Sequence, residues 1–439
     1  MRHSSSRADL VVAGAGPAGV AAAVTAARAG LHVVLCDRAV FPRDKTCGDG
    51  LTTSALRHLE HLGLDVRALA GDYAAVRETV LVSPSGRRVT LPAPDDGGLH
   101  VVVVPRSRLD AALLDVARSC GAEVLEGSPV TGVTAGAGTV DVTIAADRDG
   151  GAATEIRTPF LVAADGHWSP VRRLLEPGAT PDLGEWHAVR QYYDGVADLD
   201  GRIWVAFEPD LLPGYAWVFP LPGRRANVGF GVLREGGRVG PRSGRQMRAL
   251  WQDLLDRPIM REILGPDAVP LESARAWPIP SRFDPERLTD GASGRVLYAG
   301  DAAGVVDPMT GEGIGQALET GMLAARAVVV ATRAADASEP GTARDASSRY
   351  RRDVERGLGV DLRFSGLLRR ALRHRKGARL AIRVAGATPW TRRNFARWMY
   401  EDYPRAMLLT PRRWHRRMLT GPGAFRRPPT GPREGGTDT

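Results

Sequence analysis

The sequence predicts an α/β protein, α+β over its whole length, with a parallel-sheet domain, an inserted antiparallel sheet and a helical C-terminal region. Apolar strands run into glycine-rich turns and helices at three places, within 10–38, 160–172 and 295–321. An aromatic-rich stretch, 185–280, separates the last two and alternates as a half-covered antiparallel sheet would. The 439 residues, 43% hydrophobic and 25% charged, suffice for two or three folded domains and exclude disorder over most of the length.

The first turn has G-x-G-x-x-G spacing between two apolar strands, 10–12 and 32–35. In such a turn the first glycine permits the tight bend, the second lets the backbone approach a pyrophosphate, and the third lets helix and strand pack closely. The following helix N-terminus offers amides and a positive dipole end to phosphate, and an acid after the second strand binds a ribose hydroxyl. A Rossmann-type dinucleotide site is therefore predicted at Gly14, Gly16, Pro17, Ala18, Gly19, Asp37 and Arg38.

The second strand-to-turn segment ends at Asp165-Gly166, with Ser169 and Arg172 after it. An Asp-Gly pair after a strand is most often a simple turn. The D-G-x-x-S-x-x-R pattern, however, resembles an element of FAD-binding chains of the two-dinucleotide-fold group, which places the aspartate near the flavin. Arg106, which precedes an expected helix at 109–119, is expected to lie near Asp165.

The third segment has a buried strand, 296–299, that ends at Gly300-Asp301. After Pro308, the turn Gly311-Glu312-Gly313 opens a helix at Ile314. An aspartate at this strand end can bond a ribityl hydroxyl. The helix N-terminus would face the flavin N1/O2 edge, where reduction deposits negative charge.

A glycine-rich loop lies between the first two segments and contains Cys47, Gly48, Asp49, Gly50 and Leu51. A lone cysteine is more often a small buried hydrophobe than a reactive thiol. Its place in a Gly-Asp-Gly loop, where the backbone can approach a flat ring, favours a role in a site. A helix at 53–62, a hairpin at 80–91 and a strand at 100–104 are expected after the loop.

The three ordered FAD elements resemble the aromatic hydroxylase-like flavoproteins, a group that includes aromatic hydroxylases, flavin halogenases and prenyl reductases. Two features are similar to the geranylgeranyl reductase family: the loop at Cys47, and the pattern Tyr215-x-Trp217-x-Phe219-Pro followed by Gly229-x-Gly231. The resemblance covers about residues 8–330. Within the family it is greatest to actinobacterial menaquinone reductases, which saturate a double bond in the isoprenoid side chain of the quinone.

This resemblance implies an FAD-dependent reductase of polyprenyl C=C bonds, with NAD(P)H or ferredoxin as electron donor. An isolated alkene lacks a carbonyl that would accept hydride readily, so one carbon must be protonated while the reduced flavin delivers hydride to the other. This demands a dry aromatic tunnel and one positioned acid. Cys47, Tyr215 and Trp217 are the expected catalytic residues, with the acid open between Cys47 and Tyr215. Trp217, Phe219, Gly229 and Gly231 are the expected substrate residues, although alternating aromatics can also simply fill a sheet face.

The alternative enzyme is a flavin monooxygenase or halogenase. Halogenases depend on a lysine, and this chain has only Lys45 and Lys376; aromatic hydroxylases usually have a histidine where Gly304 stands. The three cysteines, Cys36, Cys47 and Cys120, form no C-x-x-C pair, so no metal site is expected and a reducing cytosol is the natural setting. No signal peptide and no membrane span are expected.

The region from Arg349 to Arg427 has 22 basic against 5 acidic residues. Apolar stripes beside arginines, with Trp390, Trp398 and Trp414, favour docking on an anionic membrane from the cytoplasmic side, on the inner face of the cell membrane. A helical cover with a solvated basic face and, less favoured, a nucleic-acid-binding protein are the alternatives, but no nucleic-acid motif is present.

The expected domains follow from these segments. An FAD-binding domain is expected at 8–175 and 290–333, with a sheet insertion at about 76–104. A substrate-binding sheet domain, a linker, a basic helical region and a disordered tail are expected at 176–289, 334–347, 348–420 and 421–439.

Overall fold

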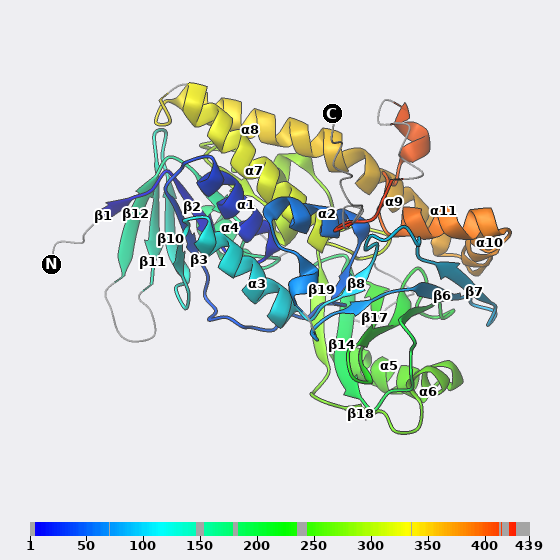
Figure 1. The fold of residues 1–439 in the computed structure, drawn as a ribbon. Helices are drawn as coiled ribbons and strands as arrows, with labels where there is room; N and C mark the ends of the chain where they lie inside the picture. Colours follow the sequence, from blue (N-terminus) through cyan, green and yellow to red (C-terminus); the bar gives the residue numbers. More distant parts are fainter. Residues whose placement is uncertain are drawn as a thin grey trace, which may run out of the picture.

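The computed structural model describes residues 5–69, 71–145, 153–178, 183–234, 244–334, 336–411, 414 and 421–426. A five-stranded parallel sheet forms the predicted dinucleotide-binding domain (Figure 1). Its order is β20 (Val296–Tyr298), β13 (Leu161–Ala163), β2 (Leu10–Ala13), β3 (Val33–Cys36) and β9 (Glu123–Leu125). Four of these strands are wholly buried and apolar, as strands covered on both faces must be. The predicted fold class is confirmed.

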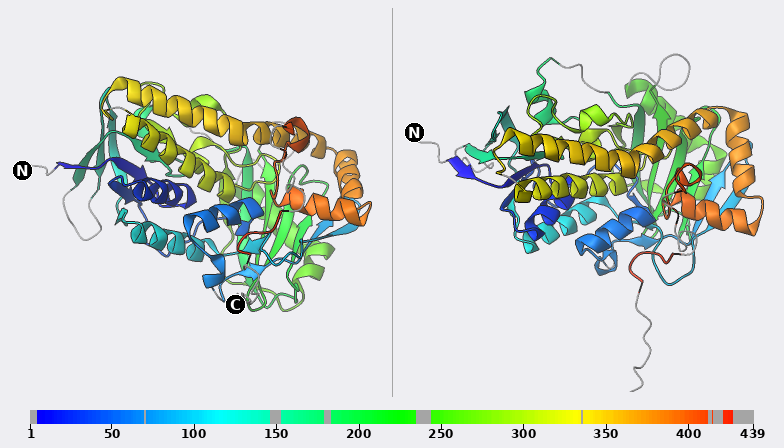
Figure 2. Two further views of the ribbon diagram at one scale, coloured as in Figure 1. Left: turned by 45° about the horizontal axis from the view of Figure 1, so that its top comes forward. Right: turned by 90° about the horizontal axis from the view of Figure 1, so that it is seen from above.

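Three long helices accompany this sheet: α1 (Pro17–Arg28), α3 (Arg106–Ser119) and α7 (Ile314–Ala334). By length and a mean hydropathy of 1.3, α7 could cross a membrane, but 78% of its apolar window is buried inside the protein. It packs against α1 and against α8 (Pro340–Val354), which runs beside it in both views of Figure 2. Its apolar character therefore serves the core of this domain.

Two small sheets and several short helices complete the domain. The first sheet has the order β1 (Ser5–Arg7), β12 (Thr154–Thr158), β11 (Val140–Ile144) and β10 (Val130–Ala135), and the second β4 (Gly50–Leu51), β8 (Val102–Val103) and β5 (Ala74–Ala75). The helix predicted at 53–62 is α2 (Thr53–Leu62), capped by the Thr52 side chain and ended by left-handed Gly63. The other short helices are α4 (Pro170–Leu175) and the turns η1 (Val66–Ala68), η2 (Pro285–Leu288) and η3 (Gly300–Ala303).

The predicted antiparallel sheet is larger than its sequence segment. Its main order is β18 (Val269–Pro270), β14 (Trp186–Asp194), β17 (Arg225–Leu233), β16 (Tyr215–Leu221), β15 (Arg202–Ala206), β6 (Glu78–Val82) and β7 (Arg88–Pro92), and β19 (Arg275–Ile279) pairs with β14. The hairpin β6–β7, expected as an insertion in the dinucleotide domain, thus extends this sheet through parallel pairing of β6 with β15.

Residues 185–280, which were predicted to form strands, also contain two helices. These are α5 (Gly244–Asp256) and α6 (Pro258–Leu264). Met247, Trp251 and Leu254 are buried at helical spacing and pack on the sheet residues, with Trp251 stacked on Phe230. The aromatic content of this segment therefore belongs partly to a helix on the sheet.

The C-terminal region corrects two expectations. The expected linker 334–347 is wrong in its second half, because α8 begins at Pro340 and buries Ala343 and Ala346. Proline at the first helical position starts a helix well, because its missing N–H has no partner there anyway. The expected disordered tail is wrong for 421–426, where Leu99 and Ala424 exchange backbone hydrogen bonds of 2.8 and 2.9 Å; residues 427–439 lie outside the described residues.

After α8 the chain continues through the short π-helix η4 (Glu355–Gly359), α9 (Val360–Leu372), α10 (Arg375–Ala385), α11 (Pro389–Met399) and the 3₁₀ turn η5 (Met407–Leu409). Helices α10 and α11 lie against β7 (Figure 1) and pack on the face of the antiparallel sheet opposite to the face that α5 and α6 cover. The region is therefore a packed part of the molecule that joins the two sheet domains.

Candidate functional site

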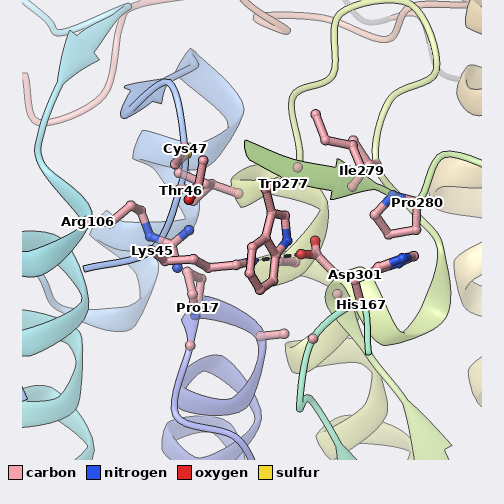
Figure 3. A pocket seen from close by; sticks show the side chains of 18 of the residues that line it. Pro17, Lys45, Thr46, Cys47, Arg106, His167, Trp277, Ile279, Pro280 and Asp301 are labelled. Carbon is pink, nitrogen blue, oxygen red and sulfur yellow. Dashed lines mark hydrogen bonds and ion pairs between the residues drawn. The ribbon is translucent and has the colours of Figure 1, made fainter. Parts of the chain in front are cut away.

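A cavity of about 700 Å³ lies between the carboxyl ends of the parallel strands and the antiparallel sheet (Figure 3). It brings together most of the residues that the sequence predicted: Gly14, Gly16, Pro17, Ala18, Asp37, Arg38, Cys47, Gly48, Asp49, Gly50, Arg106, Asp165, Gly166, Tyr215, Trp217, Phe219, Gly231, Gly300, Asp301, Gly311, Glu312, Gly313 and Ile314. Four others, Gly19, Leu51, Pro308 and Gly229, do not line it. Ligands of parallel sheets bind at this end of the strands.

The first turn has the shape that a pyrophosphate requires. A Cβ on Gly19 would lie 1.7 Å from the carbonyl oxygen of Gly14, so the helix can approach the turn only with glycine there. A Cβ on Gly16 would meet only the Arg43 side chain, at 3.7 Å, so this backbone faces the cavity. Asp37 accepts hydrogen bonds from the amides of Ala15 and Ala39 at 2.7 and 2.8 Å, which fixes the acid beside the turn.

The other end of the cavity presents polar groups of the kind that bind a ribityl chain. Burial raises the pKa of Asp165 to about 6, although its Oδ2 accepts a 2.9 Å hydrogen bond from the Val171 amide. Its buried Oδ1 has no partner among the residues that the structure describes, which suits a hydroxyl donor of a bound molecule. Asp301 pairs with Lys45 across the cavity at 2.7 Å (Figure 3). Burial alone would raise the pKa of Asp301, but the charge and hydrogen bond of Lys45, together with the charges of Arg106 and His167, outweigh it and lower that pKa.

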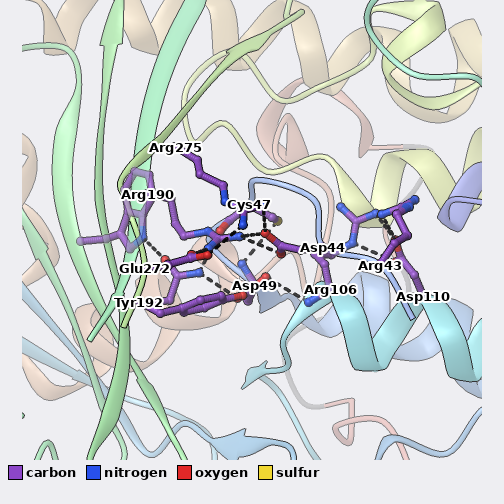
Figure 4. A network of polar contacts seen from close by, with 12 residues as sticks. Arg43, Asp44, Cys47, Asp49, Arg106, Asp110, Arg190, Tyr192, Glu272 and Arg275 are labelled. Carbon is purple, nitrogen blue, oxygen red and sulfur yellow. Dashed lines mark hydrogen bonds and ion pairs between the residues drawn. The ribbon is translucent and has the colours of Figure 1, made fainter. Parts of the chain in front are cut away.

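The Cys47 loop is held by the antiparallel sheet (Figure 4). Asp49 is fully buried at φ +65° and accepts hydrogen bonds from the Tyr192 hydroxyl at 2.6 Å and from Asn227 Nδ2 at 2.8 Å. The same Asn227 nitrogen donates to the Cys47 carbonyl at 2.8 Å. Burial raises the pKa of Asp49 to about 6 in spite of these hydrogen bonds. The carboxyl of Asp49, expected at the cofactor, thus ties the loop to β14 and β17.

A buried arginine extends this network. Arg190, with a fully buried side chain, makes ion pairs with Asp44 at 2.8 Å and with Glu272, and Arg275 also reaches Asp44 at 2.9 Å (Figure 4). Sequence reasoning missed Arg190, although a charged residue inside the apolar strand β14 was a signal of buried pairing. The loop is therefore positioned by both charges and hydrogen bonds from the sheet.

The three aromatic residues of β16 form one wall of the cavity. The rings of Tyr215 and Trp217 have centroids 6.1 Å apart, and those of Trp217 and Phe219 lie 6.2 Å apart. Gly229 makes room for this wall, because a Cβ there would lie 2.3 Å from the Trp217 ring. A Cβ on Gly48 would lie 3.3 Å from the Phe219 ring, so the wall meets the Cys47 loop directly.

Strand β19 adds residues to the cavity that the sequence did not single out. Trp277 and Ile279 of this strand and Pro280 just after it line the cavity, with Ile279 and Pro280 on the side away from Lys45 and Pro17 (Figure 3). They give the cavity further apolar surface. Their signal was weak, because the segment that contains them has no motif of its own.

Three acidic groups in the cavity, the side chains of Cys47, Tyr215 and Glu312, can hold a dissociable proton at neutral pH. Burial raises the pKa of the Cys47 thiol and of the Tyr215 hydroxyl, and the latter donates to the Thr310 carbonyl. Burial, together with the charge of Glu401, raises the pKa of Glu312 to about 8. The sequence assigned Glu312 only to cofactor binding.

Fold and cavity together define an FAD-binding oxidoreductase, and residues 7–191 match the family model described as FAD binding domain. The chain is 36% identical over 339 residues to a menaquinone reductase of Mycolicibacterium smegmatis, covering 73% of this chain and 76% of that one. It is 32% identical over 340 residues to a digeranylgeranylglycerophospholipid reductase of Methanoculleus marisnigri, covering 75% and 79%. The chain therefore belongs to the geranylgeranyl reductase family of FAD-dependent oxidoreductases, as the sequence predicted.

Solved structures show the same fold. A geranylgeranyl bacteriochlorophyll reductase-like protein of Thermoplasma acidophilum has a TM-score of 0.74 at 20% identity, covering 93% of this chain and 100% of that one. The myxobacterial halogenase CndH has a TM-score of 0.66 at 23% identity, covering 93% and 90%. The halogenase thus shares the architecture, while the sequence relatives favour the reductase over the alternative enzyme.

Proposed function

We propose that this protein saturates C=C bonds of a polyprenyl chain, either a menaquinone side chain or a geranylgeranyl group. The observation that supports this most is the aromatic wall of Tyr215, Trp217 and Phe219, which meets the Cys47 loop in the same cavity as the FAD turns. Such a wall suits an apolar chain and excludes water from the reacting atoms. Relatives named menaquinone reductase and digeranylgeranylglycerophospholipid reductase support the same substrate class.

The site residues divide between cofactor and substrate. Gly16 and the α1 N-terminus would hold the pyrophosphate, Asp37 a ribose, and Asp165 and Asp301 the ribityl hydroxyls. FAD, when bound and reduced, supplies hydride. Trp217 would stabilise positive charge that develops on the alkene through its π face.

The division into domains stays part of the proposal. Residues 8–175 and 290–333 would bind FAD, and 176–289, together with β6 and β7, would bind substrate. The electron donor would be NAD(P)H or a ferredoxin.

The reaction is testable by mass spectrometry. Protein loaded with FAD and reduced anaerobically with dithionite should add two hydrogens to the side chain of menaquinone or to a geranylgeranyl lipid. Cys47→Ser and Trp217→Ala should retain FAD and lose or redirect the reduction, while Cys120→Ser, outside the cavity lining, should behave as the wild type. Unchanged turnover and product pattern in both cavity variants would contradict their roles, and absence of any reduced product from the wild type would contradict the function.

We also propose that the protein docks on an anionic membrane surface through α9–α11. Leu367, Leu380, Val384 and Trp390 are 56–62% exposed there, and exposed arginines, among them Arg379 and Arg383, flank them. Each basic residue near an anionic leaflet contributes up to about 1 kcal/mol, which salt screens. Trp398, expected to insert with Trp390 and Trp414, instead donates to the Arg405 carbonyl at 3.0 Å and packs under the Arg405 guanidinium.

Sedimentation with liposomes tests this surface. The protein should bind anionic but not neutral vesicles and should be released by high salt. The double variant Leu380→Asp/Val384→Asp should lose binding, while Leu271→Asp, an equally exposed apolar position beside β18, should keep it. Binding that is insensitive to salt, or that prefers DNA to anionic vesicles, would contradict the proposal.

A further inference from the structure

Glu312 lies beside the Cys47 loop, on the side where the loop approaches the aromatic wall. Its Oε1 lies 3.8 Å from the position that a Cβ on Gly50 would take, and the Phe219 ring lies 3.4 Å from the same position. The residue stands between two glycines directly before α7 and lines the cavity. Among the residues that the structure describes, none donates a hydrogen bond to its carboxyl. This carboxyl is therefore available to a molecule in the cavity.

The groups behind Glu312 do not neutralise it. Glu401 is engaged by the Thr52 hydroxyl at 2.9 Å and by Gln316 Nε2 at 2.8 Å. Arg405, the cation whose charge lowers the pKa of Glu312, is shared between Glu401 at 3.4 Å and Asp307 at 3.7 Å. Cys47 and Tyr215, the other titratable groups near Glu312, are uncharged at neutral pH because burial raises the pKa of each.

These surroundings keep the proton on the carboxyl. Burial first, and the charges of Glu401 and Asp307 next, raise the pKa of Glu312 from 4.5 to about 8, while Arg405 opposes them. The start of α7 would favour the anion, but a helix terminus shifts a carboxyl by less than about one pKa unit. At neutral pH most molecules therefore hold the proton.

We propose that Glu312 is the catalytic acid that protonates the alkene, an assignment that rests on the proposed function. The O–H bond of the carboxyl breaks, and its proton forms a C–H bond with the π electrons at one alkene carbon. The other carbon receives the hydride that reduced FAD supplies, and the carboxylate regains a proton from water. One proton from Glu312 and one hydride from the flavin, which carries the electron pair, thus form the two new C–H bonds of the saturated product.

Glu312 suits this step better than the two acids expected from the sequence. The Tyr215 hydroxyl already donates to the Thr310 carbonyl, and the Cys47 sulfur accepts a 3.3 Å hydrogen bond from the Asp49 amide. Both groups are weaker acids than a carboxyl whose pKa is about 8. An unactivated alkene is a poor base, so the stronger acid gives the faster proton transfer.

The test compares Glu312→Gln and Glu312→Asp with Glu319→Gln, a control in the same helix outside the cavity lining. Flavin absorbance should show full FAD binding in all three. Glu312→Gln should lower the rate of alkene reduction about 10²- to 10⁴-fold, Glu312→Asp should restore part of it, and Glu319→Gln should leave it unchanged. The wild-type rate should fall as the pH rises through about 8, and Glu312→Gln should lack this fall.

Infrared difference spectra supply a readout that is independent of turnover. Between about pH 6 and about pH 10 the wild type and Glu319→Gln should lose the protonated-carboxyl absorbance of one group more than Glu312→Gln, because Asp49 and Asp165, whose pKa values are about 6, titrate in all three proteins. A wild type that reduces the prenyl chain beside an equally active Glu312→Gln would overturn the acid assignment and leave the proposed function standing. Loss of FAD from Glu312→Gln, or an equal loss of this absorbance in Glu312→Gln and the wild type, would also overturn it. A wild type that reduces no prenyl chain would end the proposed function and this assignment together.

Discussion

Replacing Gly321 by alanine should force apart the two helices that support the pyrophosphate turn. Gly321 lies in α7, and a Cβ there would lie 2.0 Å from the carbonyl oxygen of Ala18 in α1. The shortest distance that a Cβ tolerates is about 3.0 Å, so the helices must separate by roughly 1 Å. The atom that it meets is backbone inside a helix and cannot rotate away.

The magnitude follows from two opposing effects. Overpacking of a core contact costs about 1–3 kcal/mol, and a backbone overlap of this size belongs at the upper end. Alanine recovers about 1 kcal/mol because it favours helix over glycine. We expect a net loss of about 2 kcal/mol in the free energy of unfolding. FAD affinity should fall as well, because Ala18 lies in the first turn of the helix that faces the phosphate site.

A matched control separates packing from helix propensity. Gly366→Ala in α9 would place its Cβ no closer than 3.9 Å to Pro308, so it should stabilise the protein by up to about 1 kcal/mol. Thermal unfolding followed by circular dichroism, with and without added FAD, measures both changes. Equal stability of Gly321→Ala and the wild type, or equal shifts in the two variants, would refute the reasoning.

Three further outcomes are expected. Gly16→Val should give folded but colourless protein, because its side chain would occupy the phosphate path; normal flavin absorbance would contradict this. Arg295→Met should lower the free energy of unfolding by about 3–5 kcal/mol in denaturant titrations, because five backbone carbonyls lose their buried donor, and a loss below about 1 kcal/mol would argue against it. For Glu312, the pKa is about 8 when folded against 4.5 for a free carboxyl, so the folded state binds the extra proton between these values. Stability should therefore fall as the pH rises through that window, and Glu312→Gln should flatten the fall in melting temperature.

The three turns were predictable because their chemistry is local. Gly14, Gly16 and Gly19 predict a bend by their spacing alone, and apolar runs predict the strands on each side. The helix α2 has the bounds that the sequence predicted, and the structure shows that Thr52 caps its start and left-handed Gly63 ends it. Such signals depend on neighbours within a few positions and need no knowledge of the rest of the fold.

Long-range pairing was beyond the sequence. Nothing in the hairpin β6–β7 says that it pairs with β15, which follows more than a hundred residues later. The α5 segment was included in the strand-like stretch 185–280, although Met247, Trp251 and Leu254 repeat with helical spacing. The polar and small residues of 334–347 suggested a linker, because the small residues that α8 buries, such as Ala343 and Ala346, are also common in loops.

The site shows the same division. The cavity-lining glycines and acids were named from their motifs, but the partners that hold Asp49, namely Tyr192 and Asn227, come from two other strands. The polar surroundings of Glu312 include Glu401 and Arg405, from a region that the resemblance did not cover. Their effect on Glu312 depends on proximity that only the folded chain creates.

The pairing of Ala424 with Leu99 attaches the end of the C-terminal region to the segment before β8. Arg57 and Arg67 of the FAD-binding domain donate to the carbonyls of Pro422 and Phe425 at 2.9 and 2.6 Å, so this end is fastened by side chains as well as backbone. The helices from α8 to α11 are therefore attached to the FAD-binding domain both before α8 and after α11. Ile382 of α10 and Ala396 of α11 belong to the same apolar cluster as Trp217 and Phe219. A displacement of α10, such as contact with a bilayer would cause, would therefore reach the aromatic wall of the cavity.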